Sequence, residues 1–509
     1  MVTVKSIFAT VLLGCATGRL VVPSPGDIRS LLAMRDASQR PLGSPETTPI
    51  SVTSRKDSSY RAGNFTRIEQ DGSTCPSYGE QQWTGTVDVS DDRRLFYWLA
   101  ESRNDPAKDP VILWMNGGPG GSSLIGLFTE LGPCVLEVNA TEPVPNPWAW
   151  NNNASVVFLD QPAGTGFSSV AEGGQAPSSD EDSAVDFQNF LNIFFREVFP
   201  EKAKLPLYIA GESYGGHFTS TYTKHILDAR AHNSKDAFWG DIAGLINVNA
   251  VLDWTAVGVG TYELLCSDYR GRHFLEPEEC DHIRLSLPEL VRLGQECRQS
   301  ATDYGCLGLQ LFWAENIDAL YRKRINSGER NNYDILPEVN IPCAVHDGVC
   351  EDMSHGNFSK YLNQDHVKKA IGVPQSMNFE WLDAAVGSAY GISASQNRAK
   401  TLEFVLDAPM RSGLDGIRLL VLNGNEDYIV NTPGQMWQYD NLFWSGYGDY
   451  RISQWRDLPG DVNATGFWKG TEDGRLVFVG VDGAGHGVPG YLPEASYRIL
   501  QRWIANEWR

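Results

Sequence analysis

Short apolar runs rich in β-branched residues recur along the chain, separated by longer mixed stretches. The runs are residues 111–114, 156–159, 207–210, 245–248, 419–422 and 476–479. Their length suits buried strands, because helices in a core usually need at least about ten residues. Residues 183–199 and 218–231 lie between runs and have the length and composition of helices. Apolar strands that alternate with helices predict an α/β fold with a largely parallel sheet covered on both faces.

Two regions depart from this alternation. Residues 84–89 and 95–100 flank the turn sequence Ser90-Asp91-Asp92 and predict a β-hairpin. The region from about 255 to 350 shows no obvious central strand, yet it holds most of the cysteines. We interpret this region as an insertion that caps the sheet.

The N-terminal region has the composition of segments that are removed or remain outside a folded domain. Residues 1–18 combine Lys5, an apolar core and small residues before a cleavage point, which is typical of a signal peptide. Residues 19–70 are rich in Pro, Ser and Thr, and we expect a propeptide, as in a zymogen, or a flexible N-terminal arm. Residues 71–509 would then form the globular domain. The apolar core of the signal is too short to span a bilayer and no other segment is suitable, so we expect no membrane anchor.

The overall charge narrows the choice of partner. The formal net charge is −21 and the sequence pI is about 4.9. Because no basic run stands out, the sequence predicts no nucleic-acid partner. An acidic surface suits a protein that works in an acidic medium, where protonation reduces repulsion between carboxylates. An ordinary soluble surface explains the same composition equally well.

Cysteines and glycosylation sequons indicate the secretory pathway. The chain has nine cysteines, and removal of Cys15 with the signal leaves an even number, which predicts disulfides. The sequence alone permits about a hundred different pairings. Sequons for N-glycosylation stand at Asn64, Asn139, Asn153, Asn357 and Asn463. We expect a secreted glycoprotein, with the vacuolar lumen as the alternative location.

The clearest chemical signal is Gly211-Glu212-Ser213-Tyr214-Gly215, directly after the apolar residues 205–210. It places a G-x-S-x-G where a strand turns sharply into a helix, which exposes the serine hydroxyl next to backbone N–H groups. A glycine-rich turn with a solvated serine has the same pattern. Ser213 is therefore a candidate nucleophile that depends on other groups converging on it.

Two later strand ends carry the groups that would activate this serine. Asp427 follows residues 419–422, and His486 follows residues 476–479. Functional groups of parallel α/β sheets gather at the carboxyl ends of strands, and the order Ser, Asp, His is that of α/β-hydrolases. The histidine would take the serine proton, and the aspartate would orient the imidazole. Glu426 is a rival to its neighbour Asp427, and His486 has the alternative of an ordinary loop histidine.

A second glycine-rich stretch, residues 115–123, follows the run 111–114. In α/β-hydrolases one oxyanion donor comes from such a loop and the other from the residue after the nucleophile. Here these donors would be the N–H groups of Gly118 and Tyr214. A phosphate-binding loop is the other glycine-rich option, but the Lys-Ser/Thr that completes it is absent.

Several motifs, in this order along the chain, resemble the serine carboxypeptidase family and above all its fungal secreted members. They are Glu101-Ser102-Arg103-Asn104-Asp105-Pro106, Trp114-Met115-Asn116-Gly117-Gly118-Pro119-Gly120, Phe158-Leu159-Asp160-Gln161-Pro162, Gly211-Glu212-Ser213-Tyr214-Gly215-Gly216-His217 and Gly483-Ala484-Gly485-His486. The resemblance covers about residues 80–509. It implies an α/β-hydrolase fold, with a mostly parallel central sheet flanked by helices and a disulfide-rich cap insertion. It also implies a two-step acyl transfer that removes one residue from the C-terminus of a peptide or protein.

The resemblance assigns roles to individual residues. It matches the catalytic triad to Ser213, Asp427 and His486, the oxyanion donors to Gly118 and Tyr214, and the group that binds the substrate's terminal carboxylate to Asn116, Glu212 and the Gly117 backbone. Glu212 would then face a second carboxylate. Because two ionised carboxylates at hydrogen-bond distance repel, one of them must hold a proton, so we expect activity to favour acidic pH. A carboxylate placed by the helix dipole is the alternative for Glu212.

The same resemblance suggests how the cysteines pair. It implies the local disulfides Cys266–Cys280, Cys297–Cys306 and Cys343–Cys350, which leaves Cys75–Cys134. One departure from the family concerns specificity: Gly487 replaces a methionine that is common after the histidine, which leaves more room for the departing residue.

Other classes of function fit the chain less well. The histidines show no H-E-x-x-H or similar spacing, so we expect no metal and no cofactor. An acyltransferase on the same scaffold would share the triad and differ only in the acceptor. A catalytically silent binding protein is disfavoured, because the serine, the aspartate and the histidine are all in place.

Overall fold

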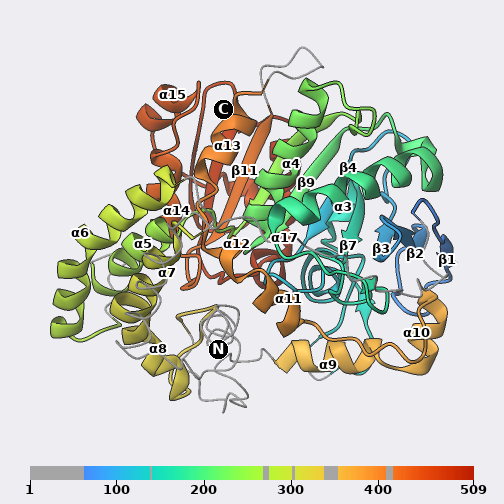
Figure 1. Cartoon of the computed structure of the whole chain (residues 1–509), viewed down its shortest axis with the longest axis horizontal. Coiled ribbons are helices and arrows are strands. Elements are labelled where there is room, and N and C mark those ends of the chain that lie inside the picture. The colour runs from blue at the N-terminus through green and yellow to red at the C-terminus, as the bar shows by residue number, and fades with distance from the viewer. Residues whose placement is uncertain are drawn as a thin grey trace, which may run out of the picture.

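The computed structural model describes residues 62–137, 140–267, 274–300, 304–336, 353–408 and 417–508. One mixed β-sheet runs through the molecule, with helices on both faces (Figure 1). In spatial order its main path is β1 (Ile68–Gln70), β2 (Gln82–Asp88), β3 (Arg93–Ala100), β7 (Ser155–Leu159), β4 (Val111–Met115), β9 (Leu207–Glu212), β10 (Ile242–Val248), β11 (Arg418–Gly424), β14 (Leu476–Val481), β13 (Gly466–Gly470) and β12 (Arg456–Asp457). The short β8 (Ser169–Val170) pairs with β3, and β5 (Cys134–Val135) pairs with β6 (Val144–Pro145).

The six strands from β7 to β14 form the parallel centre of the sheet. All six apolar runs of the sequence lie in these strands, so this part of the prediction is confirmed. Strand β4 shows why they are apolar throughout: Leu113 packs into the core on one face and Trp114 into the core on the other. Neither face of the central sheet is left to water.

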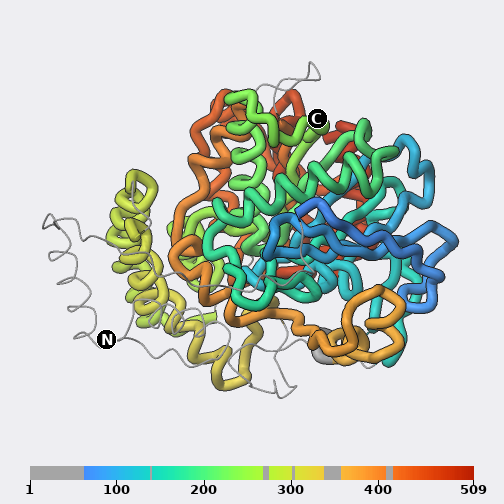
Figure 2. Tube along the Cα trace, turned by 45° about the vertical axis from the view of Figure 1, so that its right-hand side comes forward, coloured from blue at the N-terminus to red at the C-terminus, as the bar shows by residue number. Residues whose placement is uncertain are grey.

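The N-terminal edge of the sheet is antiparallel. Strands β2 and β3 form the predicted hairpin. Strand β1 pairs with β2, and Gln70 Nε2 donates to the Ala370 carbonyl 3.1 Å away, so α10 (Asp365–Ile371) covers this edge. Figures 1 and 2 both show α10 beside these early strands. Strand β1 thus lies within residues 19–70, and its sequence has too short a pattern to reveal a strand.

Helices cover the two faces of the sheet. In chain order the α-helices are α3 (Asp180–Ile193), α4 (Gly215–Ala231), α5 (Trp254–Cys266), α6 (Pro277–Gln299), α7 (Leu307–Trp313), α8 (Ala319–Asn326), α9 (Met353–Leu362), α10 (Asp365–Ile371), α11 (Ala384–Ala389), α12 (Gly391–Ser395), α13 (Ala399–Leu406), α14 (Thr432–Asp440), α15 (Tyr447–Ile452), α16 (Val488–Tyr491) and α17 (Pro493–Ile504). One core contains side chains of α3, α4, α5 and α13, and the other contains side chains of α9, α10 and α17. The sheet thus separates two apolar layers.

Helices α5, α6, α7 and α8 form the region that we interpreted as a cap insertion, and Figure 1 shows them grouped beside α14. Two of the predicted disulfides, Cys266–Cys280 and Cys297–Cys306, hold this group together. The predicted Cys75–Cys134 bond joins the chain before β2 to β5. Cys343 and Cys350 lie outside the described residues. Within the described ranges, no helix combines the length and the apolarity needed to cross a membrane.

Candidate active site

Ser213 lies on a strained turn between β9 and α4. Its φ angle is +59°, in the left-handed region that non-glycine residues rarely adopt. The turn is held by the Ser213 N–H, which donates to the Val248 carbonyl at 3.1 Å, and by the Ser213 carbonyl, which accepts from Val251 N–H at 2.9 Å. A Cβ atom on Gly211 would lie 2.6 Å from the Gly215 carbonyl oxygen, so this sharp turn requires glycine there. The predicted strand–turn–helix context is confirmed.

His486 and Asp427 meet at the carboxyl ends of neighbouring strands β14 and β11. The distance from His486 Nδ1 to Asp427 Oδ2 is 2.7 Å, and Asp427 is fully buried. The rival Glu426 is engaged elsewhere, because its Oε1 accepts from the Gly483 N–H at 3.1 Å. The aspartate, and not the glutamate, therefore orients the imidazole.

Asn249, which the sequence analysis missed, fixes this aspartate. Asn249 Nδ2 donates to Asp427 Oδ2 at 2.8 Å, and Asn249 Oδ1 accepts from the Gly424 N–H at 3.0 Å. The backbone N–H of Ile429 donates to the other carboxylate oxygen at 3.0 Å. Asn249 directly follows β10, so the available signal was a polar residue at the carboxyl end of a predicted strand.

Ser213 and His486 line the same cavity, which has a volume of about 740 Å³. The backbone of His486 is held from the cap side by the Tyr333 carbonyl, which accepts its N–H at 2.9 Å. In the described part of the chain, the Ser213 hydroxyl forms no hydrogen bond with the imidazole. Catalytic hydrogen bonds are often long without substrate and tighten in the complex.

The glycine-rich loop after β4 packs directly against the serine turn. A Cβ atom on Gly117 would lie 2.4 Å from the Tyr214 nitrogen, so only glycine allows this approach. Gly118 has a φ angle of +110°. Among the hydrogen bonds of the described residues, neither the Gly118 N–H nor the Tyr214 N–H has an acceptor. Two such N–H groups beside a nucleophile can stabilise an oxyanion.

A buried carboxylate anchors this loop. Asp160 Oδ1 accepts from the Ser122 hydroxyl at 2.6 Å and from the Ser123 N–H at 2.9 Å. Its second oxygen accepts from the Phe167 N–H at 2.9 Å. Burial raises the pKa of Asp160 to about 6, although these hydrogen bonds lower it. Asp160 lies in one of the motifs quoted above, and its place in the fold ties that motif to the loop.

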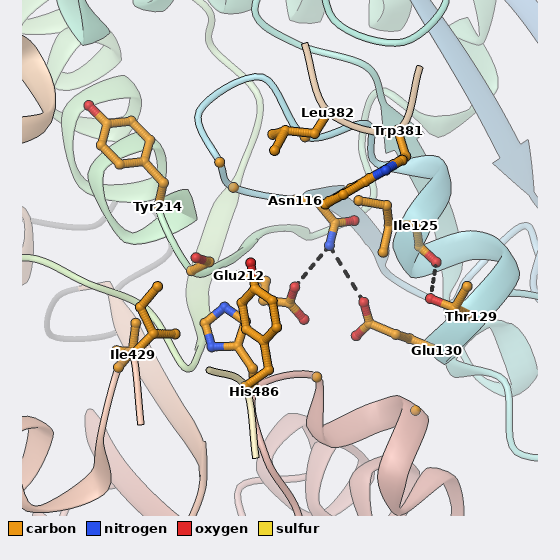
Figure 3. A pocket seen from close by; sticks show the side chains of 18 of the residues that line it. Asn116, Ile125, Thr129, Glu130, Glu212, Tyr214, Trp381, Leu382, Ile429 and His486 are labelled. Atoms are coloured by element: carbon orange, nitrogen blue, oxygen red, sulfur yellow. Dashed lines mark hydrogen bonds between the residues drawn. The ribbon is translucent and has the colours of Figure 1, made fainter. Parts of the chain in front are cut away.

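Asn116 lies at the centre of a polar group in the same cavity (Figure 3). Its Oδ1 accepts from Trp114 Nε1 at 2.7 Å and from the Gly126 N–H at 3.0 Å. These two donors turn the amide nitrogen toward two carboxyl groups, with Glu212 Oε1 at 3.0 Å and Glu130 Oε1 at 3.5 Å. Asn116 and Glu212 are thus brought together as predicted.

Glu130 is the second residue that the sequence analysis missed. Burial raises the pKa of both carboxyl groups, and the negative charge of Glu130 raises the pKa of Glu212 further. Among the described residues, Oε2 of each carboxyl group is buried and has no hydrogen-bond partner. Such a pair can hold a proton and offer it to a ligand anion. The signal in the sequence was a lone carboxylate inside the apolar residues 124–131.

The sequons differ in exposure. Asn64 and Asn463 are exposed, whereas Asn153 and Asn357 are half-buried, and Asn139 lies outside the described residues. The amide oxygen of Asn153 accepts a hydrogen bond from the Tyr497 hydroxyl. Exposure therefore favours Asn64 and Asn463 as attachment points for glycans.

The chain is similar to known serine carboxypeptidases. The family model described as serine carboxypeptidase matches residues 74–506. Carboxypeptidase Y homolog A of Fusarium vanettenii is 33% identical over 445 residues, which cover 84% of this chain and 74% of that protein. Carboxypeptidase Y of Schizosaccharomyces pombe is 34% identical over 440 residues, which cover 83% of this chain but 41% of that protein.

A solved structure supports the fold. Kex1Δp, a prohormone-processing carboxypeptidase from Saccharomyces cerevisiae, aligns with a TM-score of 0.68 at 22% identity, covering 84% of this chain and 92% of that one. At this identity the likeness concerns the fold alone, and it confirms the α/β-hydrolase architecture expected from the sequence. The family model matches most of the length of the chain, and the chain therefore belongs to the serine carboxypeptidase family.

Proposed function

We propose that this protein is a serine carboxypeptidase that releases single C-terminal residues from peptides through an acyl-enzyme. One observation carries the proposal. A single cavity joins the Ser213 hydroxyl and the Asp427-bound His486 to a buried pair of carboxyl groups, Glu130 and Glu212. The serine and the histidine can carry out acyl transfer, and the paired carboxyl groups can bind a free carboxylate.

The chemistry follows from the roles of these groups. The Ser213 oxygen attacks the last peptide carbonyl while His486 Nε2 takes the hydroxyl proton. Asp427 keeps the Nδ1–H tautomer and stabilises the imidazolium that forms. The Gly118 and Tyr214 N–H groups receive the oxyanion, each contributing up to about 3 kcal/mol. The imidazolium then protonates the departing amine, and a water molecule hydrolyses the ester by the reverse sequence of proton transfers.

The carboxyl pair explains why cleavage would occur at the chain end. Asn116 Nδ2 and the proton held by Glu212 and Glu130 can donate to the terminal carboxylate of the substrate, as can the Gly117 backbone N–H. An internal peptide bond would place no anion there and would leave the buried carboxyl oxygens without a partner. Recognition of the terminal carboxylate therefore directs cleavage to the last peptide bond of the substrate.

The test uses a pair of substrates that differ in one group. The purified protein is incubated at pH 4–6 with a peptide that has a free C-terminal carboxylate and with the same peptide as a C-terminal amide, and products are followed by mass spectrometry. We expect the free acid to lose single residues in sequence and the amide to react about a hundredfold more slowly. The Ser213→Ala variant, as control, should show no cleavage. Internal cleavage, or equal rates for acid and amide, would refute the proposal.

We also propose that the protein works in an acidic compartment of the secretory pathway, outside the cell or in the vacuolar lumen. The three disulfides of the described residues, the exposed sequons Asn64 and Asn463, and residues 1–18 support this location. Expression of the full chain in a eukaryotic secretory host should yield a product that has lost its first residues and shrinks on glycosidase treatment. An unprocessed, unglycosylated product retained in the cytosol would contradict this location.

A further inference from the structure

A buried polar group lies next to the serine turn but outside the groups that the proposed mechanism uses. We refer to Asp180, Tyr214, His217 and Arg398 as the Asp180 cluster. The Tyr214 hydroxyl donates to Asp180 Oδ1 at 2.8 Å. His217 Nδ1 lies 3.1 Å from Asp180 Oδ2, and Arg398 Nη2 donates to the same oxygen at 2.6 Å. Asp180 and His217 are fully buried, and Arg398 is nearly so.

The cluster has a definite state of charge. Burial alone raises the pKa of Asp180, but the Arg398 charge and the hydrogen bonds from His217 and Tyr214 lower it well below its usual range. Burial lowers the pKa of His217, so its ring is neutral and must donate from Nδ1 to the ionised carboxylate. Arg398 also contacts Glu181 Oε1 at 2.7 Å and the Ser393 hydroxyl at 3.2 Å. Asp180 is therefore an ionised carboxylate, and it accepts the hydrogen bond from the Tyr214 hydroxyl.

The cluster joins segments that are distant in sequence. Asp180 begins α3, Tyr214 and His217 belong to the serine turn and α4, and Arg398 immediately precedes α13. The Arg398 N–H donates to the Leu252 carbonyl at 2.8 Å, just after the segment that holds the Ser213 carbonyl. The Tyr214 ring also stacks on His217 with 4.4 Å between ring centres. The hydroxyl of Tyr214 is thus held by Asp180, and its ring is held by His217.

Figure 3 shows that the Tyr214 side chain extends away from His486 and Glu212, with its hydroxyl at the far end. The hydroxyl therefore cannot serve the reacting atoms directly. The backbone N–H of the same residue lies beside Ser213 and, within the part of the chain that the structure describes, has no acceptor. Fixing the tyrosine side chain fixes the Cα and the peptide plane that carries this N–H.

We propose that Asp180 and Arg398 are positioning residues that aim the Tyr214 N–H at the oxyanion of the transition state, acting through the Tyr214 hydroxyl. The inference rests on the proposed function. An oxyanion donor must lie within about 3 Å of the charged oxygen, so a small rotation of the peptide weakens it. The oxyanion exists only in the transition state and the tetrahedral intermediate. Loss of the anchor should therefore lower kcat and leave substrate binding unchanged.

The experiment compares Tyr214→Phe and Asp180→Asn with a matched control, Tyr222→Phe. Tyr222 is also fully buried on α4, and its hydroxyl donates to Gln161 Oε1 at 2.5 Å, far along the helix from the serine turn. Each variant of the full chain is assayed for kcat and KM. Each is also assayed for inhibition by a peptide aldehyde, which forms an oxyanion with Ser213, and for binding of the matching product peptide, which does not.

We expect Tyr214→Phe and Asp180→Asn each to lower kcat and to weaken the aldehyde about tenfold, the effect of losing a hydrogen bond to a charged group. KM and product affinity should stay within about twofold, and Tyr222→Phe should match the wild type in all four quantities. In the Tyr214→Phe background, Asp180→Asn should lower kcat by no more than about a further twofold, because each change alone already removes the Tyr214–Asp180 hydrogen bond.

The possible failures can be told apart. An inactive wild type, whose Ser213 forms no adduct with the aldehyde, overturns the proposed function and this inference with it. An active wild type whose Tyr214→Phe variant keeps its kcat and its aldehyde affinity overturns this inference alone. Equal weakening of aldehyde and product also overturns it, because that result describes general damage to the site. If Asp180→Asn does not fold, Tyr214→Phe, which removes one hydroxyl, decides the question.

Discussion

The carboxyl group of Glu212 should set the pH dependence of substrate capture. Burial and the charge of Glu130 raise its pKa, so at acidic pH it holds a proton that it can donate to the substrate carboxylate. As pH rises through this raised pKa, the group ionises and repels that carboxylate. We expect kcat/KM to fall toward neutral pH in the wild type and to fall less in Glu212→Gln, whose amide donates at every pH. The measurement is kcat/KM for one peptide from pH 4 to pH 8.

A control separates this effect from a general loss of carboxylates near the triad. Glu426→Gln makes the same change at a buried carboxyl that lies beside Asp427 but does not line the cavity. It should keep the slope of the wild-type profile. An unchanged profile in Glu212→Gln would remove Glu212 from carboxylate recognition.

At the residue scale, site residues could be predicted from the sequence where a local motif or a predicted strand end marks them. Ser213 stands in a G-x-S-x-G, and His486 ends a predicted strand. Asp427 could not be separated from Glu426, because adjacent residues in one loop differ only in where the fold points them. Asn249 and Glu130 were missed because their roles depend on contacts that form only in the folded chain. Asn249 contacts a residue 178 positions away, and Glu130 contacts Asn116, which also contacts Glu212.

At the scale of elements, the Cys75–Cys134 disulfide should stabilise the fold more than the Cys297–Cys306 disulfide does. It closes a chain separation of 59 residues, and the loss of loop entropy in the unfolded state corresponds to about 4 kcal/mol. Cys297–Cys306 closes a separation of 9 residues, which corresponds to about 3 kcal/mol. We expect replacement of Cys75 and Cys134 by alanine to lower Tm more than replacement of Cys297 and Cys306, as measured by thermal unfolding without reductant. The reverse order would show that native-state packing outweighs loop entropy here.

The elements themselves were predictable where burial on both faces makes a strand apolar throughout. The six central strands were found for this reason. Strand β13 was missed because Gly466, Lys469 and Gly470 interrupt its apolar pattern, and it becomes a strand by pairing with β14. Strand β1 is too short for any pattern and depends on β2 and on α10. These edges owe their structure to neighbours, which a local pattern does not contain.

For the whole molecule, buried carboxyl groups should make the fold more stable in mild acid than at neutral pH. Burial raises the pKa of Asp186 to about 7 and that of Asp160 to about 6. In the unfolded chain such groups titrate near pH 4, so between about pH 4 and 7 these two carboxyl groups bind more protons in the folded protein than in the unfolded one. Their contribution to the free energy of unfolding therefore falls as pH rises through this interval, and His217, whose pKa burial lowers, contributes in the opposite sense. Asp180, whose pKa is lowered, acts in the opposite sense and limits stability only below about pH 4.

Asp186 offers the cleanest test of this balance. Arg93 Nη1 forms an ion pair with its carboxylate at 3.1 Å, but burial outweighs this attraction and raises the pKa of Asp186. A rise in pKa from about 4 to about 7 corresponds to roughly 4 kcal/mol of unfolding free energy lost between acidic and neutral pH. In Asp186→Asn the group stays neutral, so Tm should change less between pH 4.5 and pH 8 than in the wild type. The exposed Asp241→Asn, as matched control, should keep the wild-type difference, and an Asp186→Asn variant that also keeps it would mean that this carboxyl does not carry the pH dependence.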